Sequence, residues 1–478
     1  MRILLIFLTF FTINSVAQQQ DRFYATMNIV DANALKIDIP EEIDIISTQG
    51  NEAAVYMSTE AAHKLHDRIL VHGPGYIFKA SEAEAMKALV EKPTVRTRMP
   101  LTITEDATVA QVLEVINTQN IEDHILELED YGTRFHTTAT GTQAAEDLKT
   151  KWEAMAALYN RSDVSVRLFN HSSTNMPSVI MTIEGSELPD EYVIVGGHLD
   201  STSSQGNNDA PGADDDASGI ATITEATRSL FEIGFVPKRT IEVMAYAAEE
   251  VGLVGSAEIA DEYSDTNVNV VAVTQFDMTN FNGSANDIYF ITDFTDSTLN
   301  SYLMDLLDHY NASGDHAITY STSLCNYGCS DHASWTNEGF MASFPFEASF
   351  AQRNGNIHTP NDTYSVSGTA DHATKFTKLC AEFLIETAKG ETVLGITTIA
   401  ENSVFAVIDG NILRYDASAA SVYYKSIQVY DVTGKKVAEH AINEKQGTID
   451  VSRLSSGVYV ANFVSNSGAT AAMKLSKK

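Results

Sequence analysis

The sequence predicts an α/β protein with a mostly parallel mixed sheet and helices on both faces, flanked by a small α/β segment and a C-terminal all-β sandwich. Residues 99–392 alternate continuous apolar runs with helical patterns, which is typical of buried parallel strands joined by helices. Residues 397–478 show short alternating strands separated by Asp-Gly, Thr-Gly and Ser-Gly turns, which indicate a sandwich. At 478 residues the chain is also too long for one core.

Residues 1–17 have the features of a secretory signal peptide. Arg2 precedes an apolar run that ends near Ile13, and Ser15-Val16-Ala17 supply small residues before a cleavage point. No later stretch approaches the roughly 20 apolar residues that a membrane span needs. We therefore expect an exported protein without a transmembrane segment.

Residues 18–98 are predicted to form a propeptide. "IDIISTQGNEAAVYM" alternates like two strands around a glycine turn, and "STEAAHKLHDRIL" and "ASEAEAMKALVEK" have helical spacing after a serine. The segment ends in "KPTVRTRMP", where Arg96 and Arg98 mark an exposed, protease-sensitive linker. We expect the segment to inhibit the protein or assist its folding until cleavage; a permanent small domain is the alternative.

The net charge of the chain limits the kinds of partner that it can bind. A net charge of −33, from 31 basic and 64 acidic residues, argues against nucleic acid as a partner, because phosphate binding needs a basic face.

Cys325 and Cys329 lie four residues apart, and export favours their oxidation to a disulfide. Metal binding by this pair is the weaker alternative, since no second cysteine pair completes a sulfur site. Cys380, in an apolar stretch, is expected to be a buried free thiol.

Acidic and histidine side chains close three of the apolar runs. "YVIVGGHLD" ends in His198 and Asp200, "TIEVMAYAAEE" in Glu249 and Glu250, and "VVAVTQFD" in Asp277. In open α/β sheets, ligands bind beyond the carboxyl ends of the strands, so these groups are expected at one edge. The loop "APGADDDASG" opens directly into a helix and belongs to the same edge.

Such a cluster cannot stay ionised without a cation, and mixed imidazole and carboxylate ligands suit zinc. His358, in the turn-rich loop "GNIHTPNDT", would balance a site with two metal ions. One of Asp214, Asp215 and Asp216 could then bridge the two ions. The alternative is that these acidic groups are merely solvated.

Spacing within the runs predicts separate roles. His198 and Asp200 share a strand face, so Asp200 can accept the imidazole proton that faces away from the metal. Glu249 and Glu250 are neighbours that point apart, so one can bind metal while the other holds an attacking water. This division is what metal-assisted hydrolysis requires.

The stretches "GGHLDST", "APGADDDASGIA", "MAYAAEEVGL", "QFDMTNF", "CNYGCSDHASW" and "IHTPNDT" resemble, in order and spacing, the secreted bacterial leucyl aminopeptidase family of di-zinc exopeptidases. The similarity covers residues 99–392. It implies two zinc ions in this domain, a hydrolase that removes N-terminal residues, and a bridging role for Asp215. It further implies that His198 and Asp277 bind one zinc, that Glu250 and His358 bind the other, that Glu249 is the general base and that Asp200 orients His198.

The resemblance also implies a Cys325–Cys329 disulfide, with Tyr327 near the oxyanion, and an apolar pocket that favours Leu, Met or Phe. The matching pocket positions are Met278, Ile291, Phe344, Phe346, Phe350 and Ile357. Arg353 stands where the family tends to have an aromatic residue, at the outer wall of this pocket.

Residues 397–478 resemble a type IX secretion sorting domain, through "VYDVTGKKV", "IDVSRLSSGVYV" and a Lys-rich terminal strand. This implies contact with secretion machinery, passage across an outer membrane, and a secreted or cell-surface location. We expect a monomer that acts on peptide or protein N-termini. The alternatives are a carboxypeptidase, with Arg353 for the substrate carboxylate, a glutaminyl cyclase on the same scaffold, or a non-catalytic binding protein.

Overall fold

The computed structural model describes residues 22–69, 72–90, 99–204, 207–392, 404–418, 424–431, 435–465 and 470–477. They form two compact units, one extending to residue 391 and one that contains the C-terminal strands. The expected signal peptide and the linker with Arg96 and Arg98 lie outside the described residues. Among the residues described, no helix is long and apolar enough to cross a membrane.

The N-terminal segment is a small α/β fold, as predicted. Its sheet has the order β2-β3-β1-β4, with every described pair antiparallel. The expected hairpin turns at Gly50, which has a φ of 60°, a conformation that glycine adopts without strain. The elements are β1 (Arg22–Asn28), α1 (Ile29–Asp38), β2 (Ile43–Gln49), β3 (Glu52–Ser58), α2 (Thr59–Ile69), β4 (Tyr76–Lys79) and α3 (Glu82–Val90).

A six-stranded sheet forms the centre of the next domain, with the order β13-β10-β7-β9-β6-β5. The pairs β13/β10, β10/β7 and β7/β9 are parallel, whereas β6 and β5 form an antiparallel edge. The predicted mostly parallel mixed sheet is confirmed. Its strands are β5 (Val164–Phe169), β6 (Ser178–Ile183), β7 (Leu188–His198), β9 (Arg239–Tyr246), β10 (Asn269–Gln275) and β13 (Ala342–Ser343).

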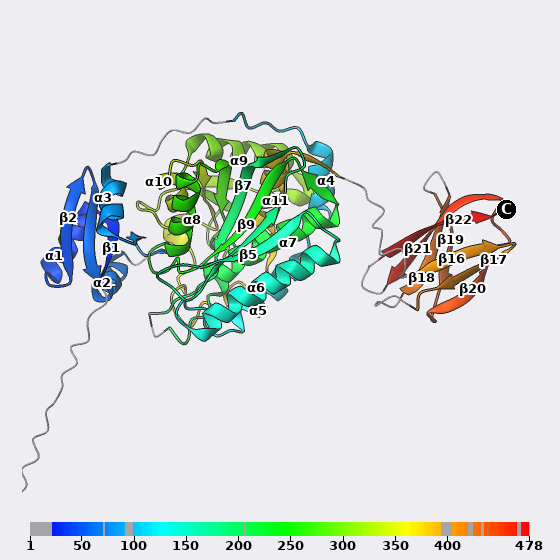
Figure 1. Ribbon diagram of the computed structural model, residues 1–478, viewed down its shortest axis with the longest axis horizontal. Helices are drawn as coiled ribbons and strands as arrows, with labels where there is room; N and C mark the ends of the chain where they lie inside the picture. Colours follow the sequence, from blue (N-terminus) through cyan, green and yellow to red (C-terminus); the bar gives the residue numbers. More distant parts are fainter. Residues whose placement is uncertain are drawn as a thin grey trace, which may run out of the picture. The chain divides into compact units, whose positions relative to one another are not determined.

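Helices cover both faces of this sheet (Figure 1). Helices α7 (Ser218–Glu232) and α11 (Asp371–Ala388) contact β7 and β9. On the other face, α8 (Val254–Asp265) and α10 (His332–Asn337) pack their buried apolar side chains against Ile194, Met244 and Tyr246. The remaining helices are α4 (Asp106–Leu113), α5 (Thr118–Glu129), α6 (Ala139–Leu158) and α9 (Ser297–Tyr310).

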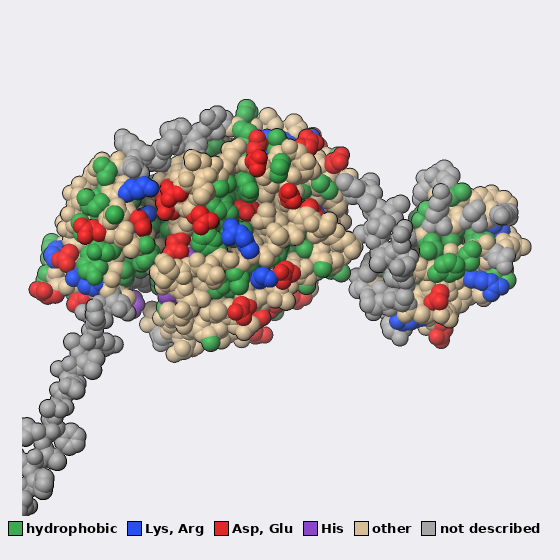
Figure 2. Space-filling view, viewed as in Figure 1, with side chains coloured by type: hydrophobic (Ala, Val, Ile, Leu, Met, Phe, Trp, Pro, Cys, Tyr) green, Lys and Arg blue, Asp and Glu red, His purple; other side chains and the backbone are tan. Residues whose placement is uncertain are grey.

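Two small sheets complete this unit. One has the order β12-β11-β14 and the other pairs β15 with β8. Their strands are β8 (Phe235–Pro237), β11 (Ile288–Ile291), β12 (Tyr320–Ser323), β14 (Pro345–Phe346) and β15 (Gly390–Thr392). On the visible surface, Asp and Glu side chains are dispersed rather than gathered into one patch (Figure 2), as expected for acidic groups that mainly solvate the protein.

The C-terminal unit is all-β. Two antiparallel sheets, β16-β17-β20 and β19-β18-β21-β22, supply side chains to one apolar core that includes Leu413, Ile427, Val429 and Phe463. This arrangement agrees with the predicted sandwich. The strands are β16 (Phe405–Asp409), β17 (Ile412–Asp416), β18 (Tyr424–Asp431), β19 (Lys436–Ala441), β20 (Gln446–Asp450), β21 (Gly457–Ser465) and β22 (Thr470–Lys477).

Candidate active site

The carboxyl ends of three neighbouring parallel strands bring the predicted polar residues together. His198 is the last residue of β7, Glu249 and Glu250 follow β9, and Asp277 follows β10. All four side chains are buried. The sheet order, with β7 between β9 and β10, is what places these groups at one edge.

Asp215 lies between two histidines. Its Oδ1 is 2.9 Å from His198 Nε2, and its Oδ2 is 3.0 Å from His358 Nε2. Asp277 Oδ1 also lies 3.5 Å from His198 Nε2, and Glu250 Oε2 lies 3.1 Å from His358 Nε2. The two oxygens of one carboxylate therefore face two separate groups of potential metal ligands.

The other two aspartates of the loop have structural roles. Asp216 accepts backbone N–H bonds from His198, Gly219 and Met278, which ties β7 and the start of α7 to the segment after β10. Asp214 accepts hydrogen bonds from the Asn280 backbone and the Asn354 side chain. Only Asp215 is left to face the histidines.

The tight packing here depends on glycine. A Cβ added to Gly219 would lie 2.1 Å from the carbonyl oxygen of Phe276. Helix α7 thus begins in direct contact with the chain after β10, which keeps the aspartate loop at the strand ends. The peptide bond between Asp215 and Asp216 is cis.

Glu249 is buried and lies outside the two groups of potential metal ligands. Neither of its carboxylate oxygens accepts a hydrogen bond from any part of the chain that the structure describes. Burial raises the pKa of Glu249 well above its usual range; His198 lowers this pKa, whereas Asp331, Glu250 and Asp277 raise it further. A buried carboxylate of this kind needs a positively charged group nearby to ionise.

Asp200 faces both His198 and the Glu249–Glu250 backbone. Its carboxylate accepts the Glu249 N–H at 2.9 Å and the Glu250 N–H at 3.3 Å. His198 Nδ1 lies 3.1 Å from the Asp200 carbonyl oxygen and 3.6 Å from its carboxylate. Asp200 therefore orients the two glutamates through their backbone, a contact that sequence spacing did not predict.

Carboxylates surround the two histidines of the cluster and shift their pKa values upward. Burial lowers the pKa of His358, but the carboxylates of Glu250 and Asp215 outweigh it, and the pKa rises to about 10. Burial raises the pKa of Glu250 to about 7, although His358 lowers it. So many carboxylates around two imidazoles fit divalent cations, and the mixed nitrogen and oxygen donors suit zinc.

The predicted substrate pocket is a single apolar cluster beside this site. All six positions pack together with the Cys325–Cys329 disulfide and the ring of Tyr327. Arg353 lies beside this cluster, where Nη1 donates to the Phe350 carbonyl oxygen at 3.1 Å and the guanidinium sits over the Phe350 ring. The expected buried free thiol is also present at Cys380.

Several residues that support the site have no local sequence pattern that indicates their role. Arg134 is fully buried and donates to the carbonyl oxygens of Leu128, Leu199, Pro211 and Gly212. Asp362, four residues after His358 in the quoted loop, accepts the backbone N–H groups of Asp214 and Asp215. Ser330 donates to Asp277 Oδ2 at 2.6 Å. His72, from the N-terminal segment, also enters the cluster, with Nε2 2.7 Å from Asp277 Oδ2.

Comparison with known proteins identifies the scaffold. Residues 178–384 match the profile of peptidase family M28, and residues 411–478 match that of a secretion system C-terminal sorting domain. A probable leucine aminopeptidase of Arthroderma benhamiae is 33% identical over 334 residues, which cover 68% of this chain and 88% of that protein. The chain belongs to peptidase family M28.

Solved structures agree with this assignment. This M28 peptidase is similar to the LapA aminopeptidase of Legionella pneumophila, with a TM-score of 0.67, 31% identity, and coverage of 77% of this chain and 99% of that one. LapB from the same organism gives a TM-score of 0.67 at 27% identity, covering 77% of this chain and 100% of that one. The family makes the chain a hydrolase of peptide bonds, and the relatives named above are aminopeptidases.

Proposed function

We propose that this M28 peptidase is a zinc aminopeptidase that removes hydrophobic N-terminal residues from peptides. The observation that supports it best is the position of Asp215, whose two oxygens each face a histidine and a further carboxylate. One zinc would be held by His198 and Asp277, the other by Glu250 and His358, with Asp215 between them. Bound zinc would lower the pKa of a water toward neutrality and polarise the substrate carbonyl.

Glu249 is proposed as the general base. Its oxygens are not committed to hydrogen bonds with the described protein, and Asp200 fixes its backbone. Glu249 would accept the proton of the attacking water and return it to the leaving amine. Tyr327, whose hydroxyl donates to the carbonyl oxygen of His72, would donate to the substrate carbonyl oxygen as its charge develops.

The apolar pocket would select the first residue of the substrate. Met278, Ile291, Phe344 and Phe346 are almost completely buried there, so a charged substrate side chain would lose its hydration without gaining a partner. We expect Leu, Met or Phe to be preferred over Glu or Lys.

The test measures metal content beside hydrolysis of aminoacyl p-nitroanilides by the processed protein. We expect two zinc ions per chain and faster hydrolysis of the leucine than of the glutamate substrate. N-acetylated leucine p-nitroanilide should not be cleaved, because an aminopeptidase acts on a free N-terminus. Cleavage of N-blocked peptides from the C-terminus would instead indicate a carboxypeptidase. A folded protein without zinc or activity would indicate a non-catalytic binding protein.

We also propose the order of domains along the chain: a signal peptide at 1–17, a propeptide at 18–98, the catalytic domain at 99–392 and a sorting domain at 397–478. The match to a C-terminal sorting domain supports export of the protein. Passage across the outer membrane by type IX secretion would leave a monomeric enzyme in the medium or at the cell surface. Mass spectrometry and size-exclusion chromatography of protein from both fractions would test this.

A further inference from the structure

The N-terminal segment reaches the centre of the candidate site through His72. The side chain of His72 is fully buried, and its Nε2 lies 2.7 Å from Asp277 Oδ2. His72, His198, Asp215 and Asp277 can each point one ligand atom at a common position, since these atoms all lie within 4.8 Å of one another. His72 lies 205 positions before Asp277 in the chain, yet it joins one of the two groups of potential metal ligands.

His72 also packs against two phenylalanines of the proposed substrate pocket. Its ring stacks on Phe346 with centroids 6.1 Å apart and meets the edge of Phe344 at 6.4 Å. The Tyr327 hydroxyl donates to the carbonyl oxygen of His72. The residue therefore covers three places that a substrate would need: the metal group, the pocket and the proposed oxyanion donor.

The backbone at Gly73, directly after His72, passes very close to the backbone at Cys329. Gly73 has a φ of 77°, and a Cβ there would lie 2.5 Å from the carbonyl oxygen of Cys329. Further along, Phe78 N–H donates to the Gly252 carbonyl oxygen at 2.9 Å, close to Glu249. Glycine is required at residue 73, so the segment is built for this close approach.

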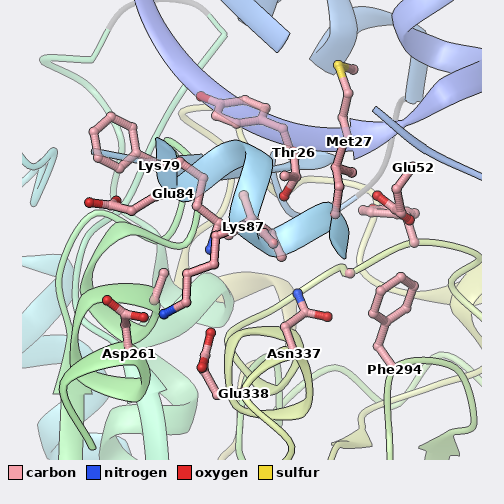
Figure 3. Close-up of a pocket in the computed structure, with 18 of the residues that line it drawn as sticks. Thr26, Met27, Glu52, Lys79, Glu84, Lys87, Asp261, Phe294, Asn337 and Glu338 are labelled. Carbon is pink, nitrogen blue, oxygen red and sulfur yellow. The ribbon is translucent and has the colours of Figure 1, made fainter. Parts of the chain in front are cut away.

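Away from His72, the contact between the N-terminal segment and the catalytic domain combines a small apolar cluster of Ile77, Leu253 and Ala333 with an open cavity. A cavity of about 570 Å³ lies between β4 and α3 on one side and α8 on the other. Figure 3 shows Lys87 of α3 extending toward Asp261 and Glu338 across it. Because charged side chains line this cavity, part of the contact is polar, as in interfaces between domains that can separate.

We propose that His72 is a removable ligand of the metal ion held by His198 and Asp277, through which the N-terminal segment keeps the uncleaved enzyme inactive. With zinc bound, the His72 imidazole would compete with the attacking water for the metal, and removal of the segment would open the site. This inference rests on the proposed zinc aminopeptidase function and adds its mode of control.

The experiment uses the chain from residue 18 with Arg96→Ala and Arg98→Ala, so that the segment stays attached, as intact mass will verify. In this background, His72→Phe keeps an aromatic ring against Phe346 but has no ligand nitrogen. His72→Ala removes the ring as well. His63→Ala is the matched control, since His63 is an exposed histidine of the same segment.

The first measurement concerns the metal and not activity. X-ray absorption of the zinc form should count three imidazoles per two metal ions in the uncleaved parent and in His63→Ala, and two in His72→Phe. The visible spectrum of the cobalt(II) form should change with the same substitution. An unchanged imidazole count and spectrum in His72→Phe, with two metal ions still bound, would overturn the proposal.

The second measurement is kcat/KM for leucine p-nitroanilide. Loss of one charge-assisted contact should raise the activity of uncleaved His72→Ala by about 10- to 100-fold, toward that of the cleaved parent. Equal activity of the cleaved and uncleaved parent would also contradict the proposed inhibitory role of His72. Failure of the proposed function would look different, because the cleaved parent itself would then bind no zinc or hydrolyse nothing.

Discussion

Replacement of Glu249 by glutamine tests the assignment of the general base directly. The amide has the volume of the carboxylate but cannot accept a proton from water at neutral pH. Glu249 makes no described side-chain hydrogen bond and lies outside both groups of potential metal ligands. The substitution should therefore leave the fold and the metal content intact.

The size of the effect follows from the role. A positioned general base contributes about 10²- to 10⁴-fold to a rate, so kcat/KM should fall by that factor, which corresponds to about 3–5 kcal/mol of transition-state stabilisation. KM should change little, because Glu249 is not part of the apolar pocket. Glu250→Gln is the matched control: its carboxylate lies 3.1 Å from His358 Nε2, so this variant should lose metal as well as activity.

The assay combines leucine p-nitroanilide kinetics of the cleaved enzyme with zinc analysis of the same samples. Two zinc ions per chain with little activity in Glu249→Gln, and a reduced zinc content in Glu250→Gln, would support the two roles. A Glu249→Gln enzyme within tenfold of the parent kcat/KM would refute the general-base assignment.

Three further predictions concern stability. Removing zinc with a chelator should lower the unfolding temperature, and added zinc should restore it, because a ligand at 1,000 times its Kd stabilises the native state by about 4 kcal/mol. Arg134→Met should lower the free energy of unfolding in urea by roughly 3–5 kcal/mol, since four buried carbonyl groups lose their donor; no change would mean that water replaces the guanidinium. Burial lowers the pKa of His372 to about 4, so its neutral form favours the fold above pH 6.5 and this contribution falls as the pH drops toward 4. Between pH 6.5 and 5 the loss should be about 2 kcal/mol, and His372→Gln should show a correspondingly flatter dependence in urea titrations.

Site residues could be placed from the sequence where each follows directly from the end of one strand. The runs that end at His198, Glu250 and Asp277 are long and apolar, so their assignment as strands did not depend on tertiary contacts. Once three such strands are parallel, their carboxyl ends must share one edge of the sheet. The proposed substrate pocket depended instead on the family resemblance, because its residues come from separate loops and short strands.

Residues that act through long-range contacts could not be predicted in the same way. Arg134 lies in a loop after α5, and nothing local indicates that its guanidinium will meet carbonyl groups up to 78 residues away. His72 is one of 13 histidines, and its approach to Asp277 depends on how the N-terminal segment packs against the rest of its unit. Its one local signal is the pair of glycines at 73 and 75, both at positive φ, which allow a tight passage but do not show where it leads.

The three consecutive aspartates show how the fold assigns different roles to identical neighbours. Repulsion among their charges predicts a cation, but it does not distinguish Asp215 from Asp214 or Asp216. The distinction arises because Asp216 accepts backbone N–H groups at the ends of β7 and β10 and the start of α7, while Asp214 accepts from the segments after β10 and before His358. The oxygens of both flanking carboxylates therefore accept hydrogen bonds that hold the loop at the strand ends. Asp215 is left with its two oxygens directed to opposite histidines, so the position of the proposed metal pair follows from the hydrogen bonds of its neighbours.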